Sequence, residues 1–385
     1  MSAQLRGLTW DHPRATAPLH AARAAFAMVR PEIEIVWNAQ PLSGFEAQPI
    51  AAAARDYDLV VFDHPHVGEV AELGLFRPVD TALRAAGLSD AHFVGPSLAS
   101  YRFRDQIWGL PLDAACQVSC ARADLLRTLD TDMPNDWAGV LTLGERALRH
   151  DLRLAVAFSG VHALMSLLTL CANQGAPLAL QSTPAFPDRD AARKALAAMR
   201  ALLPFCAPEV LDWNTIATQE AMCARDDLVY CPLVYGFAPY ARRDGPRRLH
   251  YADLPGLQPG SCGSTIGGAG LGISARSRHP DAALALALFL IDARVQEGLI
   301  ASNSGQPARV SAWSSPEVNA SSGNFYSGTR HTIDQAWVRP RFNGYLDFQR
   351  AGGPLVEAFL RGVLPAEPLL DRLEQLWREA LAHAR

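Results

Sequence analysis

Lysine is almost absent from this sequence of 385 residues: Lys194 is the only one, and the other basic residues are arginines scattered along the chain. Because 35 basic residues face 39 acidic ones, the formal charge is only −4, and no basic cluster marks a nucleic-acid surface. The longest apolar run, Ala282–Ile291, is about half the length of a membrane span. We therefore expect a globular chain that neither binds nucleic acid nor inserts into a membrane.

Motifs for cofactors, metals and export are also missing. No P-loop occurs, and "GGAGLG" (Gly267–Gly272) lacks the spacing of a dinucleotide fingerprint, so we expect no cofactor. The seven cysteines form no CxxC pair, and an odd, scattered set suits a reducing compartment. The N-terminal stretch lacks the apolar core of a signal peptide. The expected location is cytoplasmic if Met1 is the native start, and periplasmic if a signal peptide was removed.

What the sequence does contain is an alternation of strands and helices, at a length that predicts two compact units. Strands are expected at Leu5–Trp10, Glu32–Asn38 and Tyr57–Asp63, with a short helix near Gly44–Arg55. This order predicts a parallel sheet with crossover helices. A second series has expected strands at Leu152–Gly160 and Asp227–Gly236, and expected helices near 161–174, 190–203 and 214–224.

Polar and aromatic side chains follow two of these strands directly. Trp10, Asp11 and His12 end the first strand, and Asp63 and His64 end the third. Ligands of open parallel sheets bind outside the carboxyl ends of the strands, so we expect these groups at one rim. A metal site is not predicted, because Pro65 interrupts the backbone and no further Cys or His has ligand spacing. Acid–base chemistry and plain ligand binding both remain open for these residues.

Several stretches, taken in order, resemble the family 1 extracellular solute-binding proteins of ABC importers, the group that includes maltose-binding proteins. The clearest is Gly267–Trp313, in which a glycine-rich strand leads to a His-Pro-Asp helix start and then a Gly-x-Pro-Ala-Arg turn. "WGLPLDA" (Trp108–Ala114) resembles the family's hinge strand. Arg122–Leu141 and Leu233–Arg242 also fit the family pattern.

The resemblance implies an α/β, periplasmic-binding-protein-like fold of two lobes, each a mainly parallel sheet flanked by helices, with the ligand cleft at the hinge. The first lobe would hold residues 1–112 and about 266–312. The second would hold 113–265 and about 313–385. The resemblance also implies a small-molecule ligand and an ABC permease as partner. The expected cleft residues are Trp10, Asp11, His12, Asp63, His64, Asp113, Tyr235 and Arg309.

Two alternatives remain open from the sequence. A cytoplasmic enzyme on the same scaffold would use His12, His64, Asp11 and Asp63 for acid–base chemistry on a small carboxylate or hydroxylated substrate. A regulatory sensor would close on a ligand and dock another protein. The favoured hypothesis is a binding protein that closes over a sugar, polyol or small organic acid.

Overall fold

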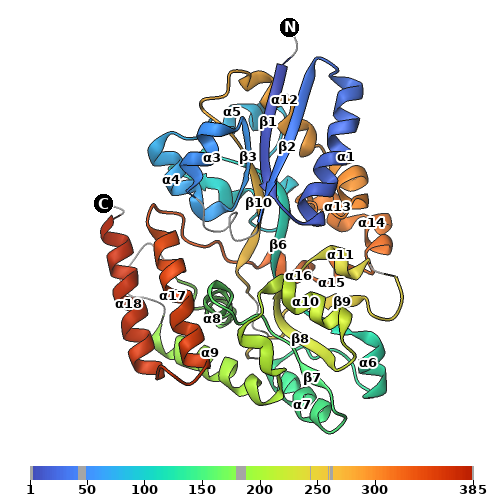
Figure 1. Ribbon diagram of the computed structural model, residues 1–385, viewed down its shortest axis with the longest axis vertical. Coiled ribbons are helices and arrows are strands. Elements are labelled where there is room, and N and C mark those ends of the chain that lie inside the picture. The colour runs from blue at the N-terminus through green and yellow to red at the C-terminus, as the bar shows by residue number, and fades with distance from the viewer. Residues whose placement is uncertain are drawn as a thin grey trace.

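The computed structural model describes residues 3–41, 49–178, 188–242, 244–258, 260 and 263–383. Figure 1 shows an elongated molecule in which helices surround strands in an upper and a lower half, with the N-terminus at the top. The strands are β1 (Ala3–Trp10), β2 (Ile33–Gln40), β3 (Leu59–Phe62), β4 (Arg102–Phe103), β5 (Gln106–Ile107), β6 (Leu110–Arg122), β7 (Arg153–Leu154), β8 (Leu228–Tyr235), β9 (Leu249–Ala252) and β10 (Ile266–Ile273).

Helices cover the strands in both halves, and α8, α9, α17 and α18 gather on the left of the lower half in Figure 1. The α-helices are α1 (Pro13–Val29), α3 (Ile50–Asp56), α4 (Val67–Leu73), α5 (Asp80–Ala85), α6 (Ala123–Thr128), α7 (Trp137–Leu148), α8 (Val161–Asn173), α9 (Arg189–Leu202), α10 (Thr215–Ala224), α11 (Ala238–Ala241), α12 (Pro280–Leu290), α13 (Val310–Ser314), α14 (Pro316–Ser321), α15 (Phe325–Gly328), α16 (Arg330–Asp334), α17 (Tyr345–Leu360) and α18 (Ala366–His383). Short 3-10 turns include η1 (His64–His66), and Val295–Ile300 is a π-helix, η6.

The main sheet has eight strands in the order β2-β1-β3-β10-β6-β8-β7, with β9 also paired to β6. β1 pairs in parallel with β2 and β3, as the crossover helices between them require. Their carboxyl ends therefore lie at the same edge, which is the edge that faces the lower half (Figure 1). β3 is apolar and buried at every position, as a strand covered on both faces should be.

Two long strands, β6 and β10, pass between the halves in Figure 1 and pair antiparallel with each other. The first part of β6 pairs with β10, and its second part pairs antiparallel with β8 and β9. A register shift at Ala269/Gly270 interrupts the ladder opposite Pro111 and Asp113. The crossing strands thus carry Asp113 into the middle of the molecule.

The predicted α/β class is confirmed, with two differences in the strands. Among the described strands of the lower half, β7 pairs in parallel with β8, whereas β6 runs antiparallel to β8 and β9. The strand expected at Leu152–Gly160 is wrong in length: β7 covers two residues, and the backbone then leaves the ladder to bond elsewhere, as Phe158 N does with Val210 O. The division into two lobes at the stated residues stays a prediction.

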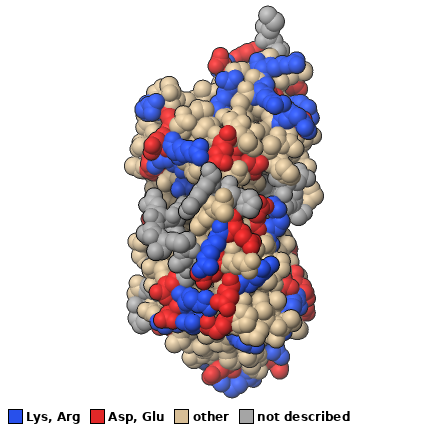
Figure 2. Space-filling view, turned by 90° about the vertical axis from the view of Figure 1, so that its left-hand side faces the viewer, with Lys and Arg blue, Asp and Glu red and all other residues tan. Residues whose placement is uncertain are grey.

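The expected helices of the second series are confirmed by α8, α9 and α10. The helix expected near Gly44–Arg55 is α3, which begins at Ile50; residues 42–48 lie outside the described residues. Among the described helices, none combines the length and the apolar character needed to cross a membrane. On the face shown in Figure 2, acidic and basic side chains are intermixed, and neither sign forms a continuous patch.

Candidate ligand-binding cleft

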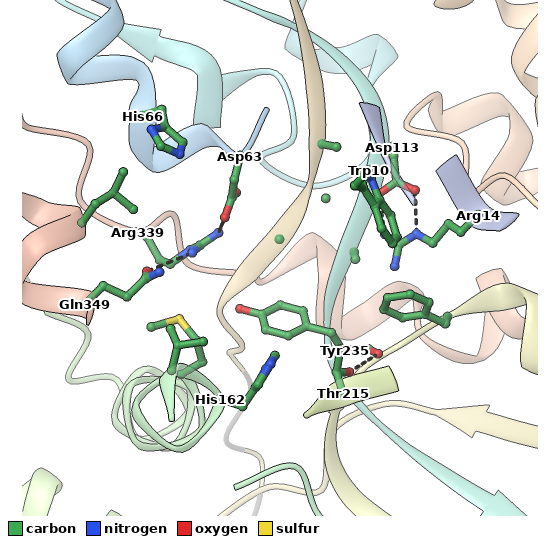
Figure 3. Close-up of a pocket in the computed structure, with 18 residues that line it drawn as sticks. Trp10, Arg14, Asp63, His66, Asp113, His162, Thr215, Tyr235, Arg339 and Gln349 are labelled. Carbon is green, nitrogen blue, oxygen red and sulfur yellow. Dashed lines mark hydrogen bonds and ion pairs between the residues drawn. The ribbon is translucent and has the colours of Figure 1, made fainter. Parts of the chain in front are cut away.

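A cavity lies where the crossing strands, the carboxyl ends of β1 and β3, and the helices of the lower half meet (Figure 3). It encloses about 790 Å³ of space not filled by atoms, its open mouth included. The side chains and glycines that line it come from most parts of the chain: Trp10, Arg14, Asp63, His66, Asp113, Ala115, Val161, His162, Met165, Thr215, Tyr235, Phe237, Gly267, Gly268, Ala269, Arg339, Leu346 and Gln349.

One side of the cavity holds an ion pair between Arg14 and Asp113. Arg14 lies in the first turn of α1, directly beyond the end of β1, and its Nε donates to Asp113 Oδ2 at 2.7 Å while Nη2 pairs with Oδ1. Its Nη1 reaches Gly236 O at 3.3 Å, just after β8. The guanidinium also lies 4.4 Å from the centre of the Phe237 ring. Arg14 therefore connects the upper half to the crossing strand and to the lower half.

A second ion pair, between Asp63 and Arg339, stands apart from the first in Figure 3. Arg339 Nη2 donates to both carboxylate oxygens, at 2.7 and 2.6 Å, and Nη1 donates to Gln349 Oε1 at 3.1 Å. Burial alone would raise the pKa of Asp63, but the charge of Arg339 and the contact with His64 hold that pKa well below its usual range. Asp63 is therefore ionised near pH 7.

Aromatic rings line the cavity beside the Arg14–Asp113 pair. Trp10 at the end of β1 is buried, and its ring meets Phe237 edge to face at 6.0 Å. Tyr235 ends β8 and projects into the cavity (Figure 3). A Cβ at Gly267 would lie only 2.8 Å from Tyr235 Cε1, so the absent side chain makes room for this ring. The aromatic faces and the Arg14–Asp113 pair together suit a ligand with both C–H and hydroxyl groups.

Two histidines of the cavity wall are buried. His162, in the first turn of α8, points into the cavity in Figure 3 and is 6% exposed. Burial lowers its pKa to about 4, so the imidazole is neutral near pH 7. His66 ends η1 and is also buried, with its Nδ1 3.9 Å from Glu69.

The His162 imidazole gives stability a predicted pH dependence. Because its pKa in the folded protein, about 4, is below the ordinary 6.5, the unfolded chain binds the proton more tightly. The stability that the neutral His162 contributes is fully present above pH 6.5 and is lost as the pH falls towards 4. Between pH 6.5 and 5, the free energy of unfolding of the original protein should fall by about 1–2 kcal/mol more than that of His162→Gln. Urea unfolding at several pH values measures both. His20→Gln, an exposed position on α1, is the control, and an equal effect there would contradict the assignment.

Four of the residues predicted from the sequence line the cavity, and four do not. Trp10, Asp63, Asp113 and Tyr235 lie in its wall. The other four, Asp11, His12, His64 and Arg309, are not part of the lining. Whether any of the eight contacts a ligand stays a prediction.

The four residues outside the lining have other surroundings. Asp11 is exposed, and His12 caps α1 by accepting the backbone N–H of Arg14 on its Nδ1 at 3.0 Å. His64 is 1% exposed behind Asp63, and burial and the charge of Arg339 lower its pKa to about 4. Arg309 is buried against the ring of Phe93, 5.1 Å from its centre. The acid–base set His12, His64, Asp11 and Asp63 therefore does not converge on the cavity.

Arg14, His162, Arg339 and Gln349 were not among the predicted cleft residues, yet they line the cavity. Arg14 and Arg339 are, with Arg309 and Arg341, the arginines that the sequence places near the predicted cleft loops, although only Arg309 was among the expected cleft residues. Nothing in the sequence pairs Arg339 with Asp63, which is 276 positions away. Within the described part of the chain, no group of three or more His, Cys, Asp or Glu side chains is arranged to hold a metal ion.

The chain is similar to solved structures along its whole length. The GacH receptor of Streptomyces glaucescens, solved unliganded and with acarbose, is 19% identical and has a TM-score of 0.82, with 100% of both chains covered. A solute-binding protein of an ABC transporter from Thermotoga lettingae, bound with α-D-tagatose, is 15% identical and has a TM-score of 0.84, covering 99% of this chain and 100% of that one. One from Agrobacterium radiobacter, in complex with ribitol, is 15% identical with a TM-score of 0.81 and covers 98% of both chains.

At these identities the structural similarity establishes the fold. None of the curated proteins matches the sequence. A family profile described as bacterial extracellular solute-binding protein matches residues 31–325, which is most of the chain. The chain therefore belongs to the bacterial extracellular solute-binding proteins, the family that its sequence motifs predicted.

Proposed function

We propose that this protein binds a sugar or polyol in the cavity, closes over it by movement of two lobes, and presents it to an ABC permease. The observation that carries the proposal is the orientation of the two ion pairs. The side chains of Asp113 and Asp63 are 13% and 16% exposed, whereas their arginine partners are 4% and 5% exposed. Both members of each pair line the cavity, and the carboxylate is the more exposed partner in each.

This arrangement favours a neutral ligand rich in hydrogen-bond donors. Hydroxyl groups can donate to the open lone pairs of both carboxylates, while a ligand carboxylate would face oxygens of the same charge. The rings of Trp10, Tyr235 and Phe237 suit the C–H faces of such a ligand. The related structures contain acarbose, tagatose and ribitol, which are all rich in hydroxyl groups. A small organic acid is therefore the less suitable member of the three predicted classes.

The family description places its members outside the cytoplasm, and we propose the same location for this chain. The enzyme alternative lacks support from the cavity, because His64 is behind its wall and His12 caps a helix. Asp63, held ionised by Arg339, is also a poor proton acceptor.

Calorimetric titration with a panel of neutral sugars and polyols, and with small carboxylates at matched concentration, tests the proposal. We expect saturable binding of at least one neutral member and none of the acids. The same ligand should raise the melting temperature, because it binds the folded state alone. Binding restricted to carboxylates, or to no member of a broad panel, would contradict it.

Tyr235 provides a test at the level of one residue. Tyr235→Phe should weaken binding of the best neutral ligand by about three- to tenfold if the hydroxyl donates or accepts one hydrogen bond. Tyr235→Ala should weaken it further, because the ring is lost as well. Tyr57→Phe and Tyr57→Ala are the controls, since Tyr57 lies against Arg6 outside the cavity. Equal losses in the two series would remove Tyr235 from the proposed site.

A further inference from the structure

One wall of the cavity is aliphatic. Val161 and Met165 lie one turn apart on α8 and face the cavity together, and Leu346 joins them from the first turn of α17. The two helices are closely packed, since a Cβ at Gly353 of α17 would come within 2.7 Å of the backbone of Gly160 and Val161. The position of this aliphatic wall is therefore rigidly determined by helix packing.

Several of the polar groups beside the aliphatic wall already bond to one another. Gln349 Oε1 accepts a hydrogen bond from Arg339, and the same guanidinium donates to both carboxylate oxygens of Asp63. At the other end, Thr215 donates its hydroxyl hydrogen to Tyr235 O at 3.1 Å. A ligand with hydroxyl groups all round would leave those that face Val161, Met165 and Leu346 without partners, at a cost in affinity.

The aliphatic wall also leads outwards. Leu346 and His66 also line a second hollow, which has about 660 Å³ of space not filled by atoms, its open side included. The other residues of this hollow come from the start of α3, from η1 and α4, and from the region where α17 begins: Pro49, Pro65, Glu69, Phe342, Asn343, Gly344, Asp347 and Arg350. A substituent that packs on Leu346 therefore lies beside this hollow, while the hydroxylated part stays near Asp113.

We infer that the ligand is a sugar or polyol that carries an apolar substituent, such as a short alkyl or aryl group, and that this substituent packs on Val161, Met165 and Leu346. This inference rests on the proposed function, because it specifies the ligand of the same cavity. The hydroxylated part engages the carboxylates of Asp113 and Asp63. The apolar part replaces water on the aliphatic wall.

A series of glycosides tests the inference. Free glucose, galactose and mannose are titrated beside their methyl, propyl and phenyl glycosides, in both anomers. For one sugar and anomer, we expect affinity to rise about fourfold per methylene that the wall buries, and by tenfold or more for phenyl over free sugar. If free sugars bind and the glycosides bind equally or more weakly, the inference is wrong and the proposed function stands. If nothing in the series or the polyol panel binds, both are wrong.

Substitutions test whether the gain in affinity for the substituted glycosides arises at the aliphatic wall. Val161→Thr keeps the shape of the side chain and Leu346→Gln keeps its approximate size, and both positions are only partly buried. Each should cut the ratio of the affinity for phenyl glycoside to the affinity for free sugar by about fivefold. The controls are Val363→Thr and Leu73→Gln, at side chains 78% and 57% exposed elsewhere on the surface. An unchanged preference in both wall variants would overturn the inference.

Discussion

Replacing Arg339 by methionine should lower the free energy of unfolding by about 3–5 kcal/mol, because it leaves the carboxylate of Asp63 without its countercharge in a buried site. The loss follows from the geometry. Both carboxylate oxygens accept from Arg339, and the aliphatic stem of methionine replaces that of arginine without supplying a donor. Urea unfolding at pH 7, followed by circular dichroism, measures the change.

The same substitution should also reduce ligand binding, since Arg339 holds Asp63 and Gln349 in the cavity wall. Arg330→Met is the matched control: Arg330 pairs with Asp334 on the surface of α16, and its loss should cost less than about 1 kcal/mol. The double variant Asp63→Leu with Arg339→Met should recover most of the stability, because no charge is then left alone. A loss in the single variant no larger than in Arg330→Met would contradict the assigned role.

The strand ends near the cavity could be predicted from the sequence, because short-range patterns determine them. A short apolar run such as Leu59–Phe62 is typical of a buried strand, and parallel strands separated by helices bring their carboxyl ends to one edge. Trp10 and Asp63 followed from this rule alone. Tyr235 followed in the same way, as an aromatic residue at the end of a predicted strand, whereas Asp113 came from the family resemblance, which places a hinge strand there.

The rule failed one residue further along the chain. His12 and His64 follow the strand ends, but at each place the backbone turns into a helix, so its side chains no longer alternate between two sides. His12 is used to cap α1, and His64 turns into the core behind Asp63. A histidine that caps a helix and a histidine that lines a cleft can both follow a strand end in the sequence. Only the structure shows which role each one has.

Arg339 shows what local patterns cannot supply. It lies in a segment without regular structure, and its neighbour Arg341 donates to the carbonyls of Ala99, Ser100 and Arg102 in the upper half. A Cβ at Gly68 would lie 1.9 Å from Arg341 O, so close backbone contact holds this segment in place. The pairing with Asp63 thus depends on contacts between segments far apart in the sequence, which no short motif records.

Gly268 is the second position at which one substitution should have a large effect. Its φ is +100°, a conformation that L side chains rarely adopt, and a Cβ there would lie 2.4 Å from Asp113 O. Alanine therefore adds backbone strain and a clash with the crossing strand β6. We expect Gly268→Ala to lower the free energy of unfolding by about 3 kcal/mol and to weaken ligand binding by about tenfold or more, because it displaces Asp113 from Arg14.

Two other glycines serve as controls that distinguish the backbone strain from the clash with β6. Gly74 ends α4 with a φ of +60° and open space around its Cβ position, so Gly74→Ala should cost only the conformational strain, about 1 kcal/mol. Gly298 is exposed in η6 with neither strain nor neighbours, and Gly298→Ala should be neutral or stabilising by about 0.5–1 kcal/mol. Neither control should alter ligand affinity. The expectation is contradicted if Gly268→Ala loses no more stability than Gly74→Ala and keeps its ligand affinity. In that case β6 and β10 can separate at this point without disturbing the Arg14–Asp113 pair, and Gly268 has no part in shaping the cavity.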